Sequence, residues 1–215
     1  LPPSSAASDV YKRQDMDYGL CVSFGAIFKA DFINANAPIF NIHLSRLPEL
    51  RGPSPVESAI LKGNTLFGYT IFKIVQEIDE GPILFQNDVE VLDNYSSNVY
   101  EALLEDFIRS FKSIDFKSPL QIQEGNVSVT SKFVKTDYMI SKEDTIFEAK
   151  NKIKAFDILG PAYIQYDSKI IKIHKYTEDN SDFKYELKDG NLCLDEITPE
   201  GKNKMTANDY IRGRQ

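Results

Sequence analysis

An amide and an imidazole at the end of one short apolar segment are the first side chains in the sequence that suit catalysis. Asn41 and His43 belong to Asn41-Ile42-His43, which closes the apolar segment 39–43. Residues two positions apart on a β-strand point to the same face, so we expect these side chains to lie together. Together they can donate hydrogen bonds to a developing oxyanion. The alternative is a structural histidine, the commoner role for a lone histidine in an apolar setting.

An acidic residue between two further apolar segments adds a proton acceptor. Asp79 lies in the sequence Glu-Ile-Asp-Glu-Gly at 77–81, where we expect Glu80 to be exposed and Gly81 to allow close backbone approach. Taken alone, this sequence is typical of a plain turn. At the same sheet edge as His43, Asp79 can accept or relay a proton through the imidazole or a water molecule. The three residues together are more specific than any one of them.

The elements that must position these residues alternate between strands and helices. Apolar segments in the first half of the chain predict strands at 19–24, 39–43, 68–75 and 82–91. Other segments predict helices at 27–35, 55–62 and 98–114. This order predicts an α/β fold with a doubly wound, Rossmann-like sheet, in which ligands bind beyond the carboxyl ends of the strands. We expect the N-terminal strands of that sheet to be missing from the chain.

The helix predicted at 55–62 has signals at both ends. Its start is marked by Ser54 as the N-cap, Pro55 at the first position and Glu57 closing a capping box. Gly63 is predicted to end it. The segment 44–55, with three prolines and a glycine, is predicted to be a loop.

The whole chain divides into four predicted parts. These are a leader at 1–14, a catalytic domain at 15–118, a linker at 119–145 and a C-terminal domain at 146–215. The leader is rich in proline and serine and is interpreted as non-native sequence joined to the gene. In the C-terminal domain a helix at 146–156 precedes four short apolar segments separated by turns, which predicts a small OB-like β-barrel. Thr206 is predicted to cap the final helix.

Composition and charge exclude several classes of protein. The chain has 215 residues, 42% of them hydrophobic, which is ample for a packed core and excludes disorder and collagen. No apolar stretch approaches the ~20 residues that cross a membrane. Cys21 and Cys193 lie far apart, which argues against a zinc site or a disulfide framework and favours a reducing compartment. Residues 1–125 carry 10 basic and 17 acidic side chains and residues 126–215 carry 15 of each, so the lysine-rich part can bind nucleic acid or form a solvated face.

Three separated segments, NIHLSRLPELRGPSP, GYT and IDEGPIL, resemble the signature of the folate-dependent formyltransferases. That family typically reads N-x-H-x-S-L-L-P-x-x-R-G-x-x-P, G-x-T and D-x-G-x-I-L in this order, and the resemblance covers roughly residues 17–115. It implies that the catalytic residues are Asn41, His43 and Asp79 and that no metal takes part. Arg46 departs from the pattern, because the family usually has the first leucine of S-L-L-P there.

The resemblance also implies two groups of binding residues. The loop after the histidine is expected to contact the substrate through Ser45, Leu47, Pro48, Arg51 and Gly52. The co-substrate 10-formyltetrahydrofolate is expected to contact Phe24, Gly25, Ala26, Ile27, Gln76 and Ile78.

The C-terminal part resembles the tRNA-binding domain of the methionyl-tRNA formyltransferase branch of this family. IKAFDILGPAYIQYDSKIIKIHKY is similar to the start of that domain, and NLCLDEITPEGKNKMTANDYIRGR is similar to its end. The implied reaction moves a formyl group from 10-formyltetrahydrofolate to the amino group of initiator methionyl-tRNA. Lys172 and Lys175 are expected to face tRNA phosphates, and His174 is assigned no catalytic role. We expect a monomer without membrane contact, in a bacterial cytoplasm or in a mitochondrial or plastid matrix.

Two alternatives stay open. A formyltransferase acting on a sugar-nucleotide amine shares the catalytic residues and a C-terminal barrel, although the lysines and the GKNKM segment favour tRNA. The second alternative is a truncated, inactive binding module, because a sheet without its N-terminal strands loses part of the donor pocket.

Overall fold

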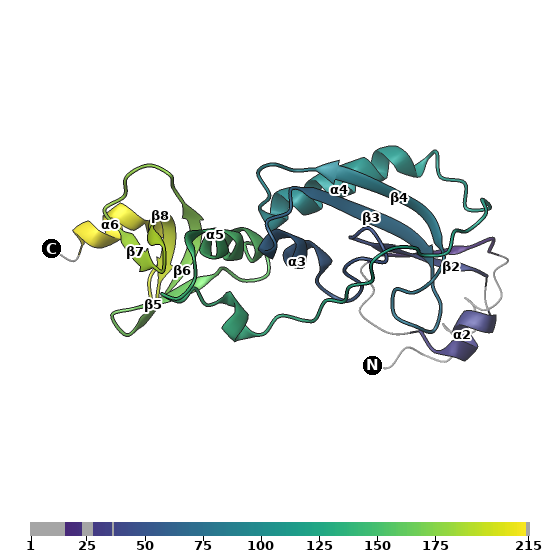
Figure 1. Ribbon diagram of the computed structural model, residues 1–215, viewed down its shortest axis with the longest axis horizontal. Helices are drawn as coiled ribbons and strands as arrows, with labels where there is room; N and C mark the ends of the chain where they lie inside the picture. The colour runs from purple at the N-terminus through teal and green to yellow at the C-terminus, as the bar shows by residue number, and fades with distance from the viewer. Residues whose placement is uncertain (1–15, 23–27, 36, 214–215) are drawn as a thin grey trace. The chain divides into compact units, whose positions relative to one another are not determined.

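The computed structural model describes residues 16–22, 28–35 and 37–213 (Figure 1). The chain forms two compact units that interleave in sequence. The first unit comprises Leu1–Gly52, Gly68–Asp88 and Phe107–Val129, and the second comprises Pro53–Phe67, Val89–Asp106 and Thr130–Gln215. The predicted leader at 1–14 lies outside the described residues, and the predicted domain boundaries stay predictions. None of the helices in the described ranges is long and apolar enough to cross a membrane.

The sheet that carries the candidate site has the order β1-β2-β3-β4. Its strands are β1 Gly19–Val22, β2 Ile39–His43, β3 Leu66–Lys73 and β4 Ile83–Glu90. β1 and β2 are parallel, whereas β2 and β3 are antiparallel, with His43 opposite Thr70. The four predicted strands are therefore present, and the α/β fold is confirmed. The described sheet is mixed, because β3 runs against β2.

A cluster of aromatic side chains surrounds the buried Phe40 beside this sheet. Phe116, in the segment after α4 (Ser96–Phe111), stacks on Tyr18 with ring centroids 4.2 Å apart. Phe116 also meets Phe40 of β2 at 5.3 Å and Phe111 at 5.9 Å. Offset and edge-to-face aromatic contacts of this kind add about 0.5–1.5 kcal/mol each to the area that they bury. They hold the start of β2 firmly, and His43 stands at the other end of that strand. The short helix α2 (Ala30–Ala35) precedes β2.

The second unit contains an antiparallel sheet of order β5-β6-β8-β7, with β9 paired to β8. Its elements are η1 Lys135–Tyr138, α5 Ile146–Ala155, β5 Tyr163–Tyr166, β6 Lys169–Tyr176, β7 Lys184–Leu187, β8 Gly190–Pro199, β9 Met205–Thr206 and α6 Ala207–Arg212. The predicted strands and helix are confirmed here, and the Thr206 side chain caps α6 by accepting from the Asp209 amide. The OB-like barrel stays a prediction.

Helix α3, Pro55–Leu61, corrects the predicted capping box. Gly63, at a φ of 81°, ends the helix as expected. Within the described residues, however, Ser54 makes no side-chain cap bond. Glu57 is 1% exposed and its Oε1 accepts a hydrogen bond of 2.9 Å from the Tyr100 hydroxyl on α4. The capping box fails because the carboxylate is drawn into the core instead of turning back to the helix start.

Burial raises the pKa of Glu57, although the hydrogen bond from Tyr100 opposes this effect. The folded protein therefore keeps a proton on Glu57 at pH values where the unfolded chain, with the ordinary carboxyl pKa of 4.5, releases it. The contribution of Glu57 to the stability of the folded protein is complete below the pKa of the unfolded state. It is lost as the pH rises through the pKa of the folded state.

We predict that Glu57→Gln removes this loss of stability at higher pH, because the glutamine side chain does not ionise. The variant should be more stable than the wild type at neutral pH, by about 1.4 kcal/mol for each unit that separates the folded and unfolded pKa values. Urea denaturation between pH 4 and pH 8 measures the effect. Glu101→Gln, an exposed position on α4, is the matched control and should change nothing. Identical pH profiles for Glu57→Gln and the wild type would contradict the prediction.

Candidate active site

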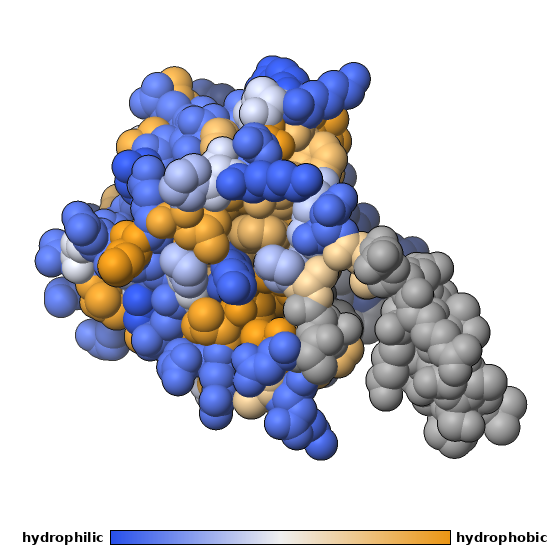
Figure 2. Space-filling model, turned by 90° about the vertical axis from the view of Figure 1, so that its right-hand side faces the viewer, coloured by the Kyte–Doolittle hydropathy of each residue, from blue (hydrophilic) through white to orange (hydrophobic). Residues whose placement is uncertain are grey.

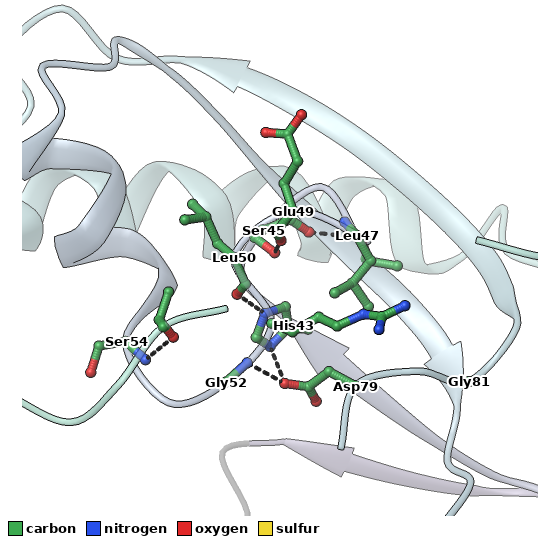
Figure 3. Close-up of polar contacts among 12 residues, drawn as sticks. His43, Ser45, Leu47, Glu49, Leu50, Gly52, Ser54, Asp79 and Gly81 are labelled. Atoms are coloured by element: carbon green, nitrogen blue, oxygen red, sulfur yellow. Dashed lines mark hydrogen bonds and ion pairs between the residues drawn. The ribbon is translucent and has the colours of Figure 1, made fainter. Parts of the chain in front are cut away.

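His43 lies at the carboxyl end of β2 and is only 7% exposed (Figure 3). Its Nε2 lies 2.8 Å from the carbonyl oxygen of Leu50, and its Nδ1 lies 3.5 Å from Oδ2 of Asp79. A carbonyl oxygen can only accept, so Nε2 must carry a proton. Both ring nitrogens therefore face oxygen atoms, a carbonyl at Nε2 and a carboxylate at Nδ1. The arrangement fixes the orientation of the imidazole beside a carboxylate.

Asp79 is held in an unusual backbone conformation. Its φ is 56°, in the left-handed region that side chains other than glycine seldom adopt. Oδ2 accepts a hydrogen bond of 2.7 Å from the amide of Gly52, whose own φ is 105°. One carboxylate oxygen thus contacts both the Gly52 amide and the imidazole of His43, as Figure 3 shows. Strained conformations of this kind are common where a side chain must be aimed at a reaction centre.

The route by which Asp79 reaches His43 differs from the expected one. Carboxyl ends share a sheet edge only in parallel strands, which holds for β1 and β2. β3 is antiparallel to β2, so Lys73 near its end lies opposite Phe40, at the start of β2. The connection 74–82 carries Asp79 back along the sheet to His43. The histidine and the aspartate are therefore brought together by this loop and not by a shared strand edge.

Asn41 lies on the same strand, half-buried and two residues before His43. Its backbone is paired with Cys21 of β1 and with Phe72 of β3. Within the described part of the chain, its side chain makes no direct bond to His43 or Asp79. The strand alternation agrees with the sequence analysis, and its role as an oxyanion donor stays a prediction.

Two hydrogen bonds with the Thr70 hydroxyl of β3 fix the loop after His43. The Thr70 hydroxyl donates to the carbonyl of Ser45 at 2.7 Å and accepts from the amide of Leu47 at 3.1 Å. The Ser45 hydroxyl donates to the carbonyl of Glu49 at 2.5 Å. Ser45, Leu47 and Pro48, which were expected to contact substrate, are buried. Their side chains support the loop, and their contact with substrate stays a prediction.

Arg46, the departure from the family pattern, has a simple structural explanation. Its side chain is exposed and pairs with Asp88 of β4 at 2.6 Å. The leucine that the family usually carries would not form this pair. The substitution therefore lies on the outer side of the loop and leaves the contacts of His43 unchanged.

The segment that carries Gln123, which the sequence analysis assigned to a linker, also contacts both loops of the site. Gln123 donates from Nε2 to the carbonyl oxygens of Asp79, at 2.7 Å, and Gly81, at 2.8 Å. Its Oε1 accepts from Nε and Nη2 of Arg51 at 3.1 and 2.7 Å. Nη1 of Arg51 also lies 2.9 Å from Oε1 of Glu80. No periodicity or motif in the sequence distinguished Gln123. Arg51 was expected to bind substrate, but its guanidinium contacts Gln123 and Glu80 of the chain itself.

The residues expected to bind the folate donor are only partly described. Phe24, Gly25, Ala26 and Ile27 lie outside the described residues. Gln76 and Ile78 are exposed in the connection 74–82. Their role therefore stays a prediction.

Two hollows lie in the first unit. One, of about 410 Å³, is lined mainly by apolar side chains of β1 and α2, and exposes Val22 and Phe32. The other, of about 300 Å³, lies between Leu47, Gln86 and the segment 121–124. Figure 2 shows apolar surface among polar side chains on one face of the molecule. In the described ranges, no group of three or more His, Cys, Asp and Glu side chains is placed to hold a metal ion.

The two lysines expected to face tRNA lie on β6 in the second unit. Ile171 and Ile173 are buried and Lys172 is exposed, as strand alternation predicts. Lys175 is exposed because the pairing of β6 with β8 shifts register on both sides of it. Lys175 also lies 3.5 Å from Glu196, whereas His174 contacts Thr198 through Nε2 at 2.8 Å. Burial lowers the pKa of His174.

Comparison with known proteins identifies the family of the chain. Residues 3–110 match the formyl transferase family, so the match begins within the predicted leader. A methionyl-tRNA formyltransferase from Thermosipho melanesiensis is 32% identical over 160 residues, 73% of this chain and 52% of that protein. The chain thus spans about half the length of this relative.

Solved structures show the same fold. HypX from Aquifex aeolicus in complex with tetrahydrofolic acid has a TM-score of 0.73 at 16% identity, covering 97% of this chain and 40% of that one. WlaRD, a sugar 3N-formyl transferase, has a TM-score of 0.62 at 21% identity, covering 86% and 73%.

We predict that Gly81→Ala displaces the connection that carries Asp79. A Cβ atom at Gly81 would lie 1.7 Å from the carbonyl oxygen of Lys73, so the backbone must move. The free energy of unfolding should fall by about 2–4 kcal/mol. Gly19→Ala is the control, because its Cβ would meet Ile39 at 3.7 Å, an ordinary contact. Urea denaturation gives both values, and equal stability of the two variants would contradict the prediction.

Proposed function

The chain belongs to the formyl transferase family, and from this premise we propose that it transfers a formyl group from 10-formyltetrahydrofolate to the amino group of initiator methionyl-tRNA. The observation that carries the proposal is the buried pair of His43 and Asp79, with Nδ1 and Oδ2 3.5 Å apart. Such a pair supplies both a positive charge for an oxyanion and a carboxylate that can accept a proton. The product would serve translation initiation.

The proposed reaction needs an oxyanion donor and a proton acceptor. The neutral amine attacks the formyl carbon, and the carbonyl π electrons move to oxygen to form a tetrahedral oxyanion. Asn41 and the imidazolium of His43 stabilise that charge. Asp79 keeps the imidazole charged and receives the amine proton, directly or through water. When the intermediate collapses, the bond to tetrahydrofolate breaks, and the nitrogen of the leaving folate takes up a proton.

The contact between His43 and Leu50 adds one step to this mechanism. Nε2 is already bonded to the Leu50 carbonyl, so the imidazolium first acts through its charge. It can donate directly to the oxyanion only when that bond is exchanged. Among the described residues, the Asn41 side chain makes no such bond, and Asn41 is proposed as the first hydrogen-bond donor.

A folate donor suits the exposed part of the connection 74–82. Ile78 is 59% exposed and immediately precedes Asp79, which places apolar surface next to the proposed proton acceptor. Gln76 and the residues Phe24, Gly25, Ala26 and Ile27 are proposed to complete the donor site. A solved neighbour bound to tetrahydrofolic acid supports this choice of donor class.

The choice of acceptor rests on the second unit and on the relatives. The relative named above is a methionyl-tRNA formyltransferase, and Lys172 projects from an exposed strand position. We therefore favour tRNA bound to an OB-like C-terminal domain, in a monomer acting in a bacterial cytoplasm or an organelle matrix. A sugar-nucleotide amine is the alternative acceptor.

We predict that the catalytic residues act as a unit. His43→Ala removes the charge that stabilises the oxyanion, and Asp79→Asn removes the proton acceptor, so each should lower kcat by ~10²-fold or more. Asn41→Ala should behave like His43→Ala. The double variant should be scarcely slower than either single one. Formylation of methionyl-tRNA and of an amino-sugar nucleotide by purified 215-residue protein measures these rates and the acceptor preference.

Asp115→Asn, an exposed acidic position in the first unit, is the matched control and should keep the wild-type rate. An Asp79→Asn rate above about half that of the wild type would show that Asp79 is only a turn residue. A folded wild-type protein that formylates neither acceptor would overturn the proposed function.

We also predict a specific effect of charge on the acceptor. Lys172→Glu should raise the KM for tRNA and reduce the slope of its salt dependence by about 1, with the KM for the folate donor unchanged. Lys175→Glu should have a smaller effect, because Glu196 already offsets that charge. Lys184→Glu, an exposed lysine on β7, is the control. Equal tRNA kinetics for all three variants would assign these lysines to a solvated face.

A further inference from the structure

We propose that Gln123 is a positioning residue for the His43–Asp79 pair, an inference that rests on the proposed function. Its side-chain amide joins the connection 74–82, which carries Asp79, to Arg51 in the loop after His43. Gln123 itself touches neither ring nitrogen of His43, so its effect must pass through the residues that it holds.

The amide of Gln123 is fully used. Nε2 makes its two donations to the carbonyls of Asp79 and Gly81, and Oε1 receives two donations from Arg51. A glutamine amide offers two donor hydrogens and one oxygen with two lone pairs, so no capacity is left over. Four bonds from one side chain fix its orientation and bring both loops to a set separation.

Asp79 depends on these bonds because little else holds its backbone. Its neighbours Ile78 and Glu80 are exposed, with side chains 59% and 50% accessible. The carbonyls on either side of Glu80 are bonded by Gln123, and the Glu80 carboxylate is paired with Arg51. The left-handed conformation of Asp79 is therefore held by the pair of Arg51 and Gln123.

Arg51 also links Gln123 to the loop that contacts Nε2 of His43. Leu50, the residue before it, receives the Nε2 bond of His43, and Gly52, the residue after it, donates to Asp79. Moving Arg51 must therefore move both contacts. Gln123 thus holds the two loops that face the two ring nitrogens.

Hydrogen bonds on both sides of Gln123 fix the segment that carries it. Two residues earlier, the amide and carbonyl of Gln121 bond to Ile83 of β4 at 2.8 and 2.7 Å. Five residues later, Ser128 accepts from the amides of Leu50 and Arg51, both at 2.9 Å. The segment is anchored on both sides of Gln123, so the amide is preorganised and does not need to be recruited.

The kinetic test compares three substitutions. Gln123→Met keeps the length of the side chain and removes all four bonds, whereas Gln123→Glu keeps an acceptor for Arg51 but removes both donations to the connection 74–82. Both should lower kcat by about 10- to 100-fold, because a small misplacement of catalytic groups has effects of that size. The KM values for donor and acceptor should change less than about twofold. Gln121→Met, the same change on the exposed side of this segment, should keep the wild-type kcat.

A second readout does not depend on activity. The chain contains two histidines, so the ring C–H resonances of His43 and His174 can be followed by NMR in the intact protein. Gln123→Met should shift the His43 resonance in the direction that Asp79→Asn shifts it and leave His174, in the second unit, in place. Gln123→Glu should do the same, and it supplies the result if Gln123→Met does not fold.

The two readouts separate the two proposals. If the wild type does not formylate either acceptor, the proposed function fails, while a shifted His43 resonance still supports the positioning role. An unchanged His43 resonance in a folded Gln123 variant overturns the positioning role, even when the wild type is active. A loss in KM alone, with kcat intact, also overturns it, because it would place Gln123 in substrate binding.

Discussion

The site depends on one constraint, which is that both nitrogens of a buried imidazole face oxygen acceptors. His43 meets a carbonyl at 2.8 Å and a carboxylate at 3.5 Å, and its side chain is almost inaccessible to solvent. A buried polar side chain is stable only when its partners are fixed, because removing one of them leaves an unsatisfied buried group. The loops that carry Leu50 and Asp79 must therefore be held as firmly as β2, from which His43 projects.

The chain meets this demand with unusual backbone conformations that are secured by distant residues. Leu50 and Asp79 both have positive φ, at 55° and 56°, which costs on the order of 1–3 kcal/mol for each non-glycine residue. Ser128 bonds the amide of Leu50, and Gln123 bonds the carbonyl of Asp79. One extended segment thus supports both strained residues. These bonds give loops outside the regular strands the fixed geometry that catalysis requires.

Local patterns in the sequence predicted what local physics determines. Strand β2 and the cap of α6 were predicted because alternation and an N-cap involve residues a few positions apart. The capping box of α3 failed because Glu57 found Tyr100, a partner 43 positions away. Gln123 was missed for the same reason, since its partners lie 42 to 72 positions before it. The antiparallel direction of β3 depends in the same way on long-range pairing, so the shared sheet edge expected for His43 and Asp79 was wrong.

The division into two units separates the chemistry from the choice of acceptor. His43, Asp79, Gln123 and their supporting contacts all belong to the first unit. An imidazolium beside a carboxylate assists attack by any amine, and nothing in those contacts distinguishes methionyl-tRNA from an amino sugar. Discrimination between two acceptors requires contacts that differ between them. Those contacts must come from outside the pair, and the tRNA contact proposed for Lys172, exposed on β6 of the second unit, would supply one that a small acceptor lacks.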